Sequence, residues 1–225
     1  MFLYDTHVHT SEVSPCSYTP AAEAIGYYLD AGYDGLVITD HYTYGVCDPE
    51  IESGLTQDAA VERFLSGYEA AIRTAAGKMT ILLGMELRFY EMNNDFLVFG
   101  ISHDFLLKYP DIRHMRPSTF HQLAKENDLL VFAAHPFRNG MMVLPPSVID
   151  GVEVMNGHLG HDSRNYLAEA YADQFNLLKS SGSDFHEAGN EARGGIITKT
   201  SIRDNKDLLE CLRNQPALMI PGSNW

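Results

Sequence analysis

The chain has 225 residues, of which 45% are hydrophobic and 20% are charged, and its formal net charge is −14 at pH 7. This length suits one large domain with a substantial core, and we expect a single domain over residues 1–225. Stable nucleic-acid binding is not expected, because it requires a basic surface that displaces counterions.

Cysteine usage and the apolar runs indicate a cytoplasmic protein. Cys16, Cys47 and Cys211 are odd in number and scattered, which argues against a disulfide framework. The sequence begins directly with a strand-like run and lacks the basic and then apolar segments of a secretory signal. The longest apolar run, residues 129–134, is far too short to span a membrane. We therefore expect no membrane association, and the sequence does not indicate an oligomeric state.

Seven short apolar runs are predicted strands, and six of them end in histidine or an acid. These six ends are Asp5–His9, Thr39–His41, Met85–Glu86, Ile101–His103, Ala134–Pro136 and Ser183–His186. The seventh run, residues 151–156, ends in Asn156. Residues 196–202 are a further candidate strand.

Helix-like stretches separate these runs and cover residues 20–31, 56–76, 117–127, 162–175 and 204–213. The first follows Thr19, a candidate N-cap, with Pro20 suited to the first helical position and Gly32 to the end. Strands that alternate with helices predict an α/β domain with parallel strands, here a distorted barrel of seven units. The stretches 42–55 and 103–116 follow strand ends, and we expect them to form walls of the barrel mouth.

The C-terminal ends of parallel barrel strands converge on one mouth, where such folds carry their chemistry. Imidazoles and carboxylates gathered there are ligands for Zn, Mn and Fe ions. The pair His7 and His9 is weak evidence by itself, because a chain with ten histidines produces His-x-His at an appreciable rate by chance. Repetition of one ligand type at six strand ends is far rarer. The sequence therefore predicts a metalloenzyme.

In sequence order, these motifs resemble those of the polymerase and histidinol phosphatase (PHP) family. The resemblance rests on Asp5–Thr10, Thr39–His41, Glu86, His103, His135–Pro136 and Gly182–His186, and it runs to about residue 196. It implies a distorted (β/α)7 barrel of the PHP type, in agreement with the strand count. It also implies a three-metal centre, in which we expect two to three divalent ions (Zn, Mn or Fe).

The resemblance further implies which residues hold each metal. The first would be held by His7, His9, Glu86 and Asp184, the second by Glu86, His103 and His135, and the third by His41 and His186, with Glu86 bridging the first two. The family completes the third site with a His or Asp from the loop after the His-x-His pair, and this chain lacks that residue. Either Cys16 or Glu12 is expected to take its place, and a thiolate would favour zinc or iron.

The expected chemistry follows from adjacent divalent ions, which lower the pKa of a bridging water from about 15.7 towards 7 and stabilise charge on phosphoryl oxygens. We expect Glu86 and Asp184 to act in catalysis, and Arg138 and Arg193 to bind a phosphate. Further residues are expected beside the substrate (Asn156, His158, His161) or beside the ligand histidines (Asp5, Asp40).

The predicted function is a metal-dependent phosphoesterase that acts on a small phosphorylated substrate. A phosphomonoester such as histidinol phosphate and a nucleotide phosphodiester are both compatible with the motifs. One alternative is a C–N hydrolase of the amidohydrolase type, which also has His-x-His at its first strand but often bridges its metals with a carboxylated lysine. Another is a non-catalytic PHP module that binds metal for structure or for a partner.

Overall fold

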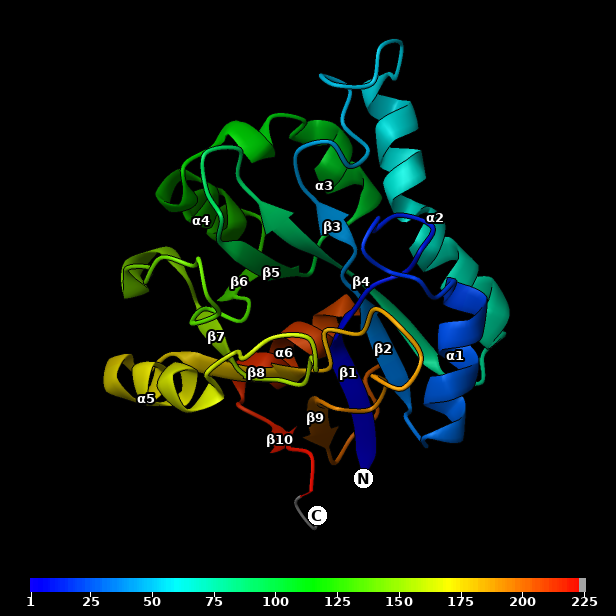
Figure 1. Cartoon of the computed structure of the whole chain (residues 1–225), viewed down its shortest axis with the longest axis vertical. Coiled ribbons are helices and arrows are strands. Elements are labelled where there is room, and N and C mark those ends of the chain that lie inside the picture. The colour runs from blue at the N-terminus through cyan, green and yellow to red at the C-terminus, as the bar shows by residue number, and fades with distance from the viewer. Residues whose placement is uncertain (223–225) are drawn as a thin grey trace.

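The computed structural model describes residues 1–222, so the last three residues of the predicted domain lie outside it. Its main feature is a ten-stranded sheet that curls into a nearly closed barrel (Figure 1). The strands are β1 (Phe2–Val8), β2 (Gly35–Ile38), β3 (His41–Tyr42), β4 (Thr80–Arg88), β5 (Asp95–Phe99), β6 (Leu130–Ala133), β7 (Gly151–Asn156), β8 (Leu178–Gly182), β9 (Gly195–Thr198) and β10 (Ala217–Met219). Their order is β10-β9-β1-β2-β4-β5-β6-β7-β8, with β3 paired to β4.

The barrel closes where β1 meets β8. Val8 and Phe185 form a parallel bridge there. The His9 N–H donates to the Phe185 carbonyl at 3.0 Å, and the Phe185 N–H donates to the His7 carbonyl at 3.3 Å. The ring therefore runs through β1, β2, β4, β5, β6, β7 and β8, which confirms the predicted distorted barrel. Strands β9 and β10 extend the sheet beyond β1 in antiparallel register.

One strand of the ring runs in the direction opposite to the prediction. β5 is antiparallel to both of its neighbours, β4 and β6, whereas seven parallel strands were expected. Only residues 89–94 join β4 to β5. A connection this short suits an antiparallel pair, because a parallel pair needs a crossover of a dozen or more residues. The C-terminal end of β5 consequently lies at the end of the barrel opposite to the mouth.

All five predicted helices are present, with small changes at their ends. The helices are α1 (Ala21–Asp30), α2 (Gln57–Ala75), α3 (His103–Lys108), α4 (Pro117–Glu126), α5 (Asn165–Phe175) and α6 (Asn205–Arg213), with 3-10 turns at Ile112–His114 and Pro146–Val148. Thr56 caps α2 by accepting the Ala59 N–H at 3.2 Å. α3 is the exception, since it lies in the stretch 103–116 that was predicted to be a wall loop, and none of that stretch lines the mouth.

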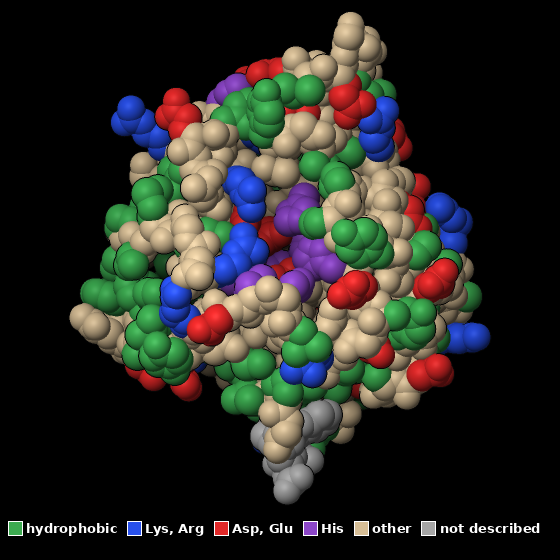
Figure 2. All heavy atoms as spheres, viewed as in Figure 1, with side chains coloured by type: hydrophobic (Ala, Val, Ile, Leu, Met, Phe, Trp, Pro, Cys, Tyr) green, Lys and Arg blue, Asp and Glu red, His purple; other side chains and the backbone are tan. Residues whose placement is uncertain are grey.

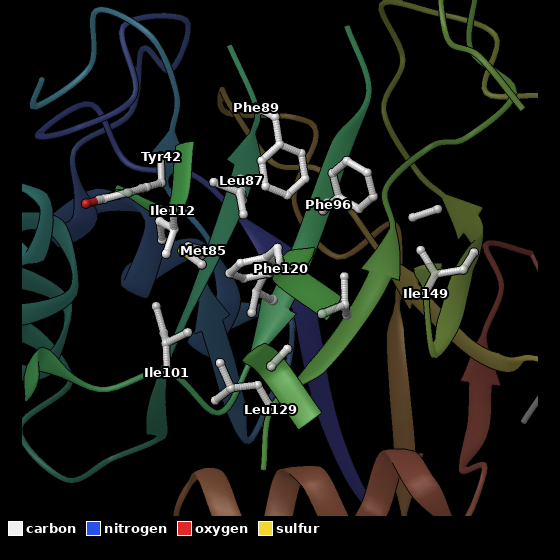
Figure 3. Close-up of a cluster of buried hydrophobic side chains, with 14 of the residues drawn as sticks. Tyr42, Met85, Leu87, Phe89, Phe96, Ile101, Ile112, Phe120, Leu129 and Ile149 are labelled. Carbon is white, nitrogen blue, oxygen red and sulfur yellow. The ribbon is translucent and has the colours of Figure 1, made fainter. Parts of the chain in front are cut away.

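Alternating side chains of the strands separate an inner core from an outer one. On β4, Leu82 points into the barrel and Leu83 points to the outer core. The inner core contains Leu208, Leu209 and Leu212 of α6, so this helix closes the end of the barrel opposite to the mouth. The outer core packs β4–β7 against α2, α4 and α5, and its aromatic centre is shown in Figure 3. Only the mouth of the barrel is therefore left open for a site.

Within residues 1–222, we find no helix with the length and apolar character needed to cross a membrane.

Candidate metal centre

The open end of the barrel is a hollow of about 500 Å³ in which histidines, acids and arginines gather (Figure 2). The structure brings eight of the nine predicted ligands together here: His7, His9, Cys16, His41, Glu86, His135, Asp184 and His186. His135 and Asp184 have φ angles of 28° and 52°, values that residues other than glycine rarely adopt. Backbone strain of this kind is concentrated at functional sites. A larger hollow of about 800 Å³ between β9, α6 and β10 contains none of the predicted ligands.

His7 and His9 are held so that their Nε2 atoms face one another. His7 Nδ1 donates to Glu153 Oε1 at 2.8 Å, and His9 Nδ1 lies 3.1 Å from Ser14 Oγ. The Ser14 hydroxyl donates its own proton to Asp40 Oδ1 at 2.7 Å, so it accepts from His9. The two Nε2 atoms are 3.0 Å apart. Two lone pairs at this distance repel one another unless a cation lies between them, so the position suits a proton or a metal ion.

Two carboxylates complete this group of ligand atoms, which we call the His7 site (His7, His9, Glu86 and Asp184). Oxygens of Glu86 lie 3.6 Å from His7 Nε2 and 3.4 Å from His9 Nε2. Asp184 Oδ1 lies 3.4 Å and 3.5 Å from the same two nitrogens. Ligand atoms about 2.1 Å from a tetrahedral zinc ion are roughly 3.4 Å from one another. The four side chains therefore already have the spacing of a metal site.

A second group, which we call the Cys16 site, consists of Cys16, His41 and His186. His41 Nε2 lies 3.1 Å from Cys16 Sγ, and the ligand atoms of His9, His41 and His186 lie within 4.8 Å of one another. His186 Nδ1 donates to the Asp184 carbonyl at 2.9 Å, so Nε2 is the nitrogen that can contact Cys16 or bind a cation. The thiol and two imidazoles form a donor set typical of zinc sites.

Of the two loop residues expected to complete this group, Cys16 and Glu12, only Cys16 lies there. The Ala21 N–H donates to Oε2 and Oε1 of Glu12 at 3.0 Å and 3.1 Å, so Glu12 caps α1 and lies outside the centre. Cys16 is therefore the loop residue at the centre. Burial raises the pKa of its thiol, but hydrogen bonds with His186 and His41 have a larger opposite effect and lower this pKa to about 6. A low pKa favours the thiolate, which is the form that binds metal.

This low pKa predicts selective alkylation of Cys16 in the metal-free protein. The rate with iodoacetamide should rise with pH to a plateau, with a midpoint near pH 6, because the thiolate is the nucleophile. Cys47 and Cys211 are internal controls, since burial raises the pKa of each thiol to about 11. Peptide mass spectrometry after timed alkylation measures all three rates. Equal rates for the three cysteines at pH 7 would contradict this account of Cys16.

Glu86 lies at the centre of the ligand set. Its Oε1 accepts from His135 Nε2 at 2.9 Å, and its Oε2 lies 2.8 Å from His41 Nδ1. Burial raises the pKa of this carboxyl group, but the charges of His41 and His7 hold it well below its usual range. Oε2 is buried, and within residues 1–222 no group with suitable geometry donates a hydrogen bond to it. A buried carboxylate oxygen without a donor is costly, and a bound cation would satisfy it.

Asp184 is also kept ionised by the histidines around it. Burial raises the pKa of its carboxyl group, while the charge of His7 and bonds from His161 and His9 lower it well below its usual range. The pKa of His9 is instead well below its usual range, because of burial and the charges of His186 and His41. A neutral imidazole beside two carboxylates is prepared to bind a metal without first losing a proton.

The prediction that His103 joins this centre is wrong. His103 begins α3, its side chain is 43% exposed, and its Nε2 lies 3.2 Å from Glu62 on α2. It follows β5, and because β5 is antiparallel, its C-terminal end points away from the mouth. The first residue of the same strand, Asp95, is at the mouth instead, and its ligand atoms group with those of Glu86 and His135.

Of the two arginines predicted to bind phosphate, the structure brings one to the hollow. Arg138 lines it, and its Nη2 lies 3.4 Å from Asp95 Oδ2. Arg193 does not line it, because its Nε donates to the Gly157 carbonyl at 2.9 Å. Arg88, at the end of β4, is the arginine that the sequence analysis missed. It lines the hollow and makes a two-pronged contact with Asp95 at 2.6 Å and 2.8 Å.

Glu153, in the middle of β7, was also missed and orients two of the ligands. Its Oε1 accepts from His7 Nδ1, and its Oε2 accepts the His135 N–H at 2.9 Å and the Asn156 side-chain amide at 2.9 Å. Asn156 also donates to Asp184 Oδ2 at 3.1 Å. Carboxylates that bind the second nitrogen of a ligand histidine fix its tautomer and its orientation.

The loop after β7 fixes His161 against the same carboxylates. The Asn156 Oδ1 accepts from the Ser163 hydroxyl at 3.1 Å, so the Ser163 oxygen accepts from His161 Nδ1 at 3.0 Å. His161 Nε2 then lies 3.5 Å from Asp184 Oδ2, and the ring of His158 stacks on that of His161. Both histidines line the hollow, as expected for residues beside a substrate.

The two aspartates next to the ligand histidines have different tasks. Asp40 orients His9 through Ser14, as described above. Asp5 bonds no imidazole, since it accepts the His7 and Ser183 N–H groups at 3.1 Å and 3.0 Å and the Tyr28 hydroxyl at 2.7 Å. It therefore holds β1 to the loop after β8.

The role of Glu153 predicts a loss of metal affinity in Glu153→Gln. The substitution keeps the volume of the side chain but replaces one carboxylate oxygen with an NH2 group. That group is a donor, so it cannot accept a hydrogen bond from His7, His135 or Asn156 as the carboxylate does. We expect metal affinity to fall by about 10–100-fold, as measured by competition with a chromophoric chelator. Glu169→Gln, on the exposed face of α5, is a matched control that should bind metal like the wild type. Unchanged affinity in Glu153→Gln would show that Glu153 does not orient His7.

No protein-family model matches the sequence, and no curated protein matches it significantly. Solved structures do match the fold. A two-domain protein from Bacteroides vulgatus, which contains a predicted PHP-like metal-dependent phosphoesterase, aligns with a TM-score of 0.68 and 16% identity over 97% of this chain and 64% of that one. PsfC from Pseudomonas syringae aligns with a TM-score of 0.66 and 16% identity, over 98% and 92%. Endonuclease Q, in complex with a 27-mer duplex with an abasic lesion at the active site, aligns with a TM-score of 0.62 and 13% identity, over 97% and 58%.

The chain has the PHP fold. The resemblance seen in the sequence is thus confirmed at the level of the fold, including the distorted barrel. This chain spans less than two thirds of the Bacteroides protein and of Endonuclease Q. Because Endonuclease Q is bound to DNA, the PHP fold does not by itself support the expectation that nucleic acid is excluded.

Proposed function

We propose that this chain is a metal-dependent phosphoesterase that hydrolyses a small phosphorylated substrate at the mouth of its barrel. The observation that carries the proposal is the His7 site, where the Nε2 atoms of His7 and His9 lie 3.0 Å apart among the carboxylates of Glu86 and Asp184. A metal-dependent phosphoesterase and an endonuclease with the same fold support hydrolysis of phosphoesters.

The donor set fits divalent ions of zinc, manganese or iron, with Cys16 favouring zinc or iron at its own site. When bound, such ions polarise phosphoryl oxygens and lower the pKa of a water. Glu86 Oε2 lies 3.4 Å from His9 Nε2 and 2.8 Å from His41 Nδ1, so this carboxylate would bind a metal at the His7 site and orient His41 toward the Cys16 site. Asp184 borders both sites as well, since its Oδ1 is 3.4 Å from His186 Nδ1.

The surroundings of the ligands favour a small phosphate ester. The hollow, at about 500 Å³, is within the usual range for small-molecule sites, which is roughly 300–1,000 Å³. Arg88 and Arg138 both line it and both bond Asp95 Oδ2, so together they can bind phosphoryl oxygens. The chain's net charge of −14 disfavours a long polyanion such as DNA.

The two rival functions fit less well. A C–N hydrolase of the amidohydrolase type often uses a carboxylated lysine, but no lysine of residues 1–222 lines the hollow, and a carboxylate, Glu86, lies at the centre of the ligand set. A metal site with a purely structural role does not need an open hollow lined by His158, His161 and two arginines.

A substrate screen tests the proposal. Protein reconstituted with Mn or Zn is assayed with p-nitrophenyl phosphate, bis(p-nitrophenyl) phosphate, a panel of small natural phosphomonoesters, a p-nitroanilide and a duplex containing an abasic lesion. We expect turnover of small phosphate esters and none of the anilide or the duplex. Cleavage of the anilide alone would favour the amidohydrolase alternative, and cleavage of the duplex alone would favour a nuclease. No turnover of any compound would contradict the proposal.

A further inference from the structure

The third group of ligand atoms in the hollow, Glu86, Asp95 and His135, differs from the other two because its aspartate is already bonded. Arg88 Nε donates to Asp95 Oδ1 at 2.6 Å, and Arg88 Nη2 donates to Asp95 Oδ2 at 2.8 Å. Arg138 Nη2 donates to the same Oδ2 at 3.4 Å. The Asp95 side chain is 1% exposed, so these two arginines are its main partners.

These bonds occupy the Asp95 oxygens that a metal ion at this group would need. Oδ2 is the Asp95 oxygen that faces His135, at 3.8 Å from its Nε2, and it already accepts from two guanidinium groups. A divalent ion bound there would have to displace the fork of Arg88 from a buried carboxylate. It would also lie beside two side chains that are always positively charged. The residues present therefore do not fit a metal at this position.

Each arginine keeps N–H donors that the bonds to Asp95 do not use. The bonds to Asp95 use Nε and Nη2 of Arg88 and Nη2 of Arg138, out of five N–H donors on each side chain. The side chains are 35% and 28% exposed, and both line the hollow next to Glu86 and His135. A guanidinium with a fixed orientation binds phosphoryl oxygens through paired hydrogen bonds.

We propose that this centre holds two metal ions, at the His7 site and the Cys16 site, and that Arg88 and Arg138, held by Asp95, bind a phosphoryl group where a further metal would otherwise lie. The inference rests on the proposed function, because it assigns the anion-binding part of that site. In this arrangement Asp95 is a positioning residue. The positive charge next to Glu86 and His135 comes from the two arginines and not from a metal ion.

Metal counting and phosphate binding test this without any turnover. Wild type, Arg88→Met and Arg138→Met are loaded with Mn or Zn, freed of excess metal and analysed by inductively coupled plasma mass spectrometry. Each is then titrated with inorganic phosphate by calorimetry. We expect two metal equivalents per chain in all three proteins, and a phosphate Kd at least about tenfold weaker in Arg88→Met. Arg203→Met is the matched control, because Arg203 is 78% exposed, pairs with Asp207 and does not line the hollow, and it should match the wild type.

A third metal equivalent in the wild type, or a phosphate Kd in Arg88→Met within twofold of the wild type, would overturn the inference. If Arg88→Met fails to fold by circular dichroism, Arg88→Lys takes its place, since it keeps the charge but cannot form the fork. An intermediate Kd is then expected, and a wild-type Kd would again overturn the inference. Phosphate binding as expected, without hydrolysis of any ester, would reject the proposed function and leave this assignment standing.

Discussion

Replacing Glu86 with glutamine should lower kcat for phosphoester hydrolysis by at least about 10³-fold. The carboxylate is 1% exposed and lies at the centre of the ligand set. Its oxygens are 2.8–3.6 Å from nitrogens of four imidazoles, those of His7, His9, His41 and His135. Glutamine keeps the volume but removes the charge that balances cations at both metal sites. The measurement is kcat with p-nitrophenyl phosphate at saturating metal, together with the metal content of the variant.

Glu62→Gln is the matched control for this prediction. Glu62 is 62% exposed on α2 and lies beside His103, outside the hollow, so the same chemical change there should leave kcat and metal content unaltered. A Glu86→Gln protein that keeps more than a tenth of wild-type turnover would show that the Glu86 carboxylate is not needed to hold the catalytic metal. Its melting temperature should be measured as well, so that loss of function is separated from loss of fold.

Removing the metal ions with a strong chelator should abolish hydrolysis and lower Tm by about 10 °C. A ligand that binds only the native state stabilises it by about 4 kcal/mol when its concentration is 1,000 times Kd. For a chain of 150–250 residues, each kcal/mol shifts Tm by about 2–4 °C. The chelated protein also loses the cations that neutralise its buried carboxylates, Glu86 and Asp184. Differential scanning fluorimetry, before chelation and after Zn or Mn is added back, measures the shift.

His103→Ala provides the control for the metal-dependent shift in Tm. Its side chain is exposed and contacts Glu62, so the variant should show the same rise in Tm on metal addition as the wild type. A wild-type Tm that does not respond to chelation and metal addition would contradict binding at the barrel mouth. A response lost in His103→Ala would contradict the position that the structure gives to this residue.

The ligands that could be predicted from sequence are those at or just after the end of a strand that runs toward the mouth. His7, His9 and His135 belong to this class, because an apolar run followed by a histidine fixes both the position and the direction of the side chain. Asp95 could not be found in this way, because it precedes its strand, and its place depends on the direction of β5. The short connection of residues 89–94 contained that information, since it permits only an antiparallel pair.

Two further residues show where strand geometry would have helped and where it would not. Arg88 follows Glu86 by two residues in the same strand, so the alternation of side chains already places both on one face. Glu153 is different, because it lies within an apolar run at a position that resembles the interior of a strand. Its role depends on β7 lying next to β8 and on a contact with His7, which is 146 residues away in the sequence. Such a contact exists only once the barrel has closed.

The most direct test of the central claim is anomalous diffraction from crystals of protein loaded with zinc or manganese. The account predicts one anomalous peak among His7, His9, Glu86 and Asp184, and a second among Cys16, His41 and His186. It predicts no peak beside Asp95, where the guanidinium of Arg88 lies. Crystals of metal-loaded protein without anomalous density at the His7 site would contradict the account.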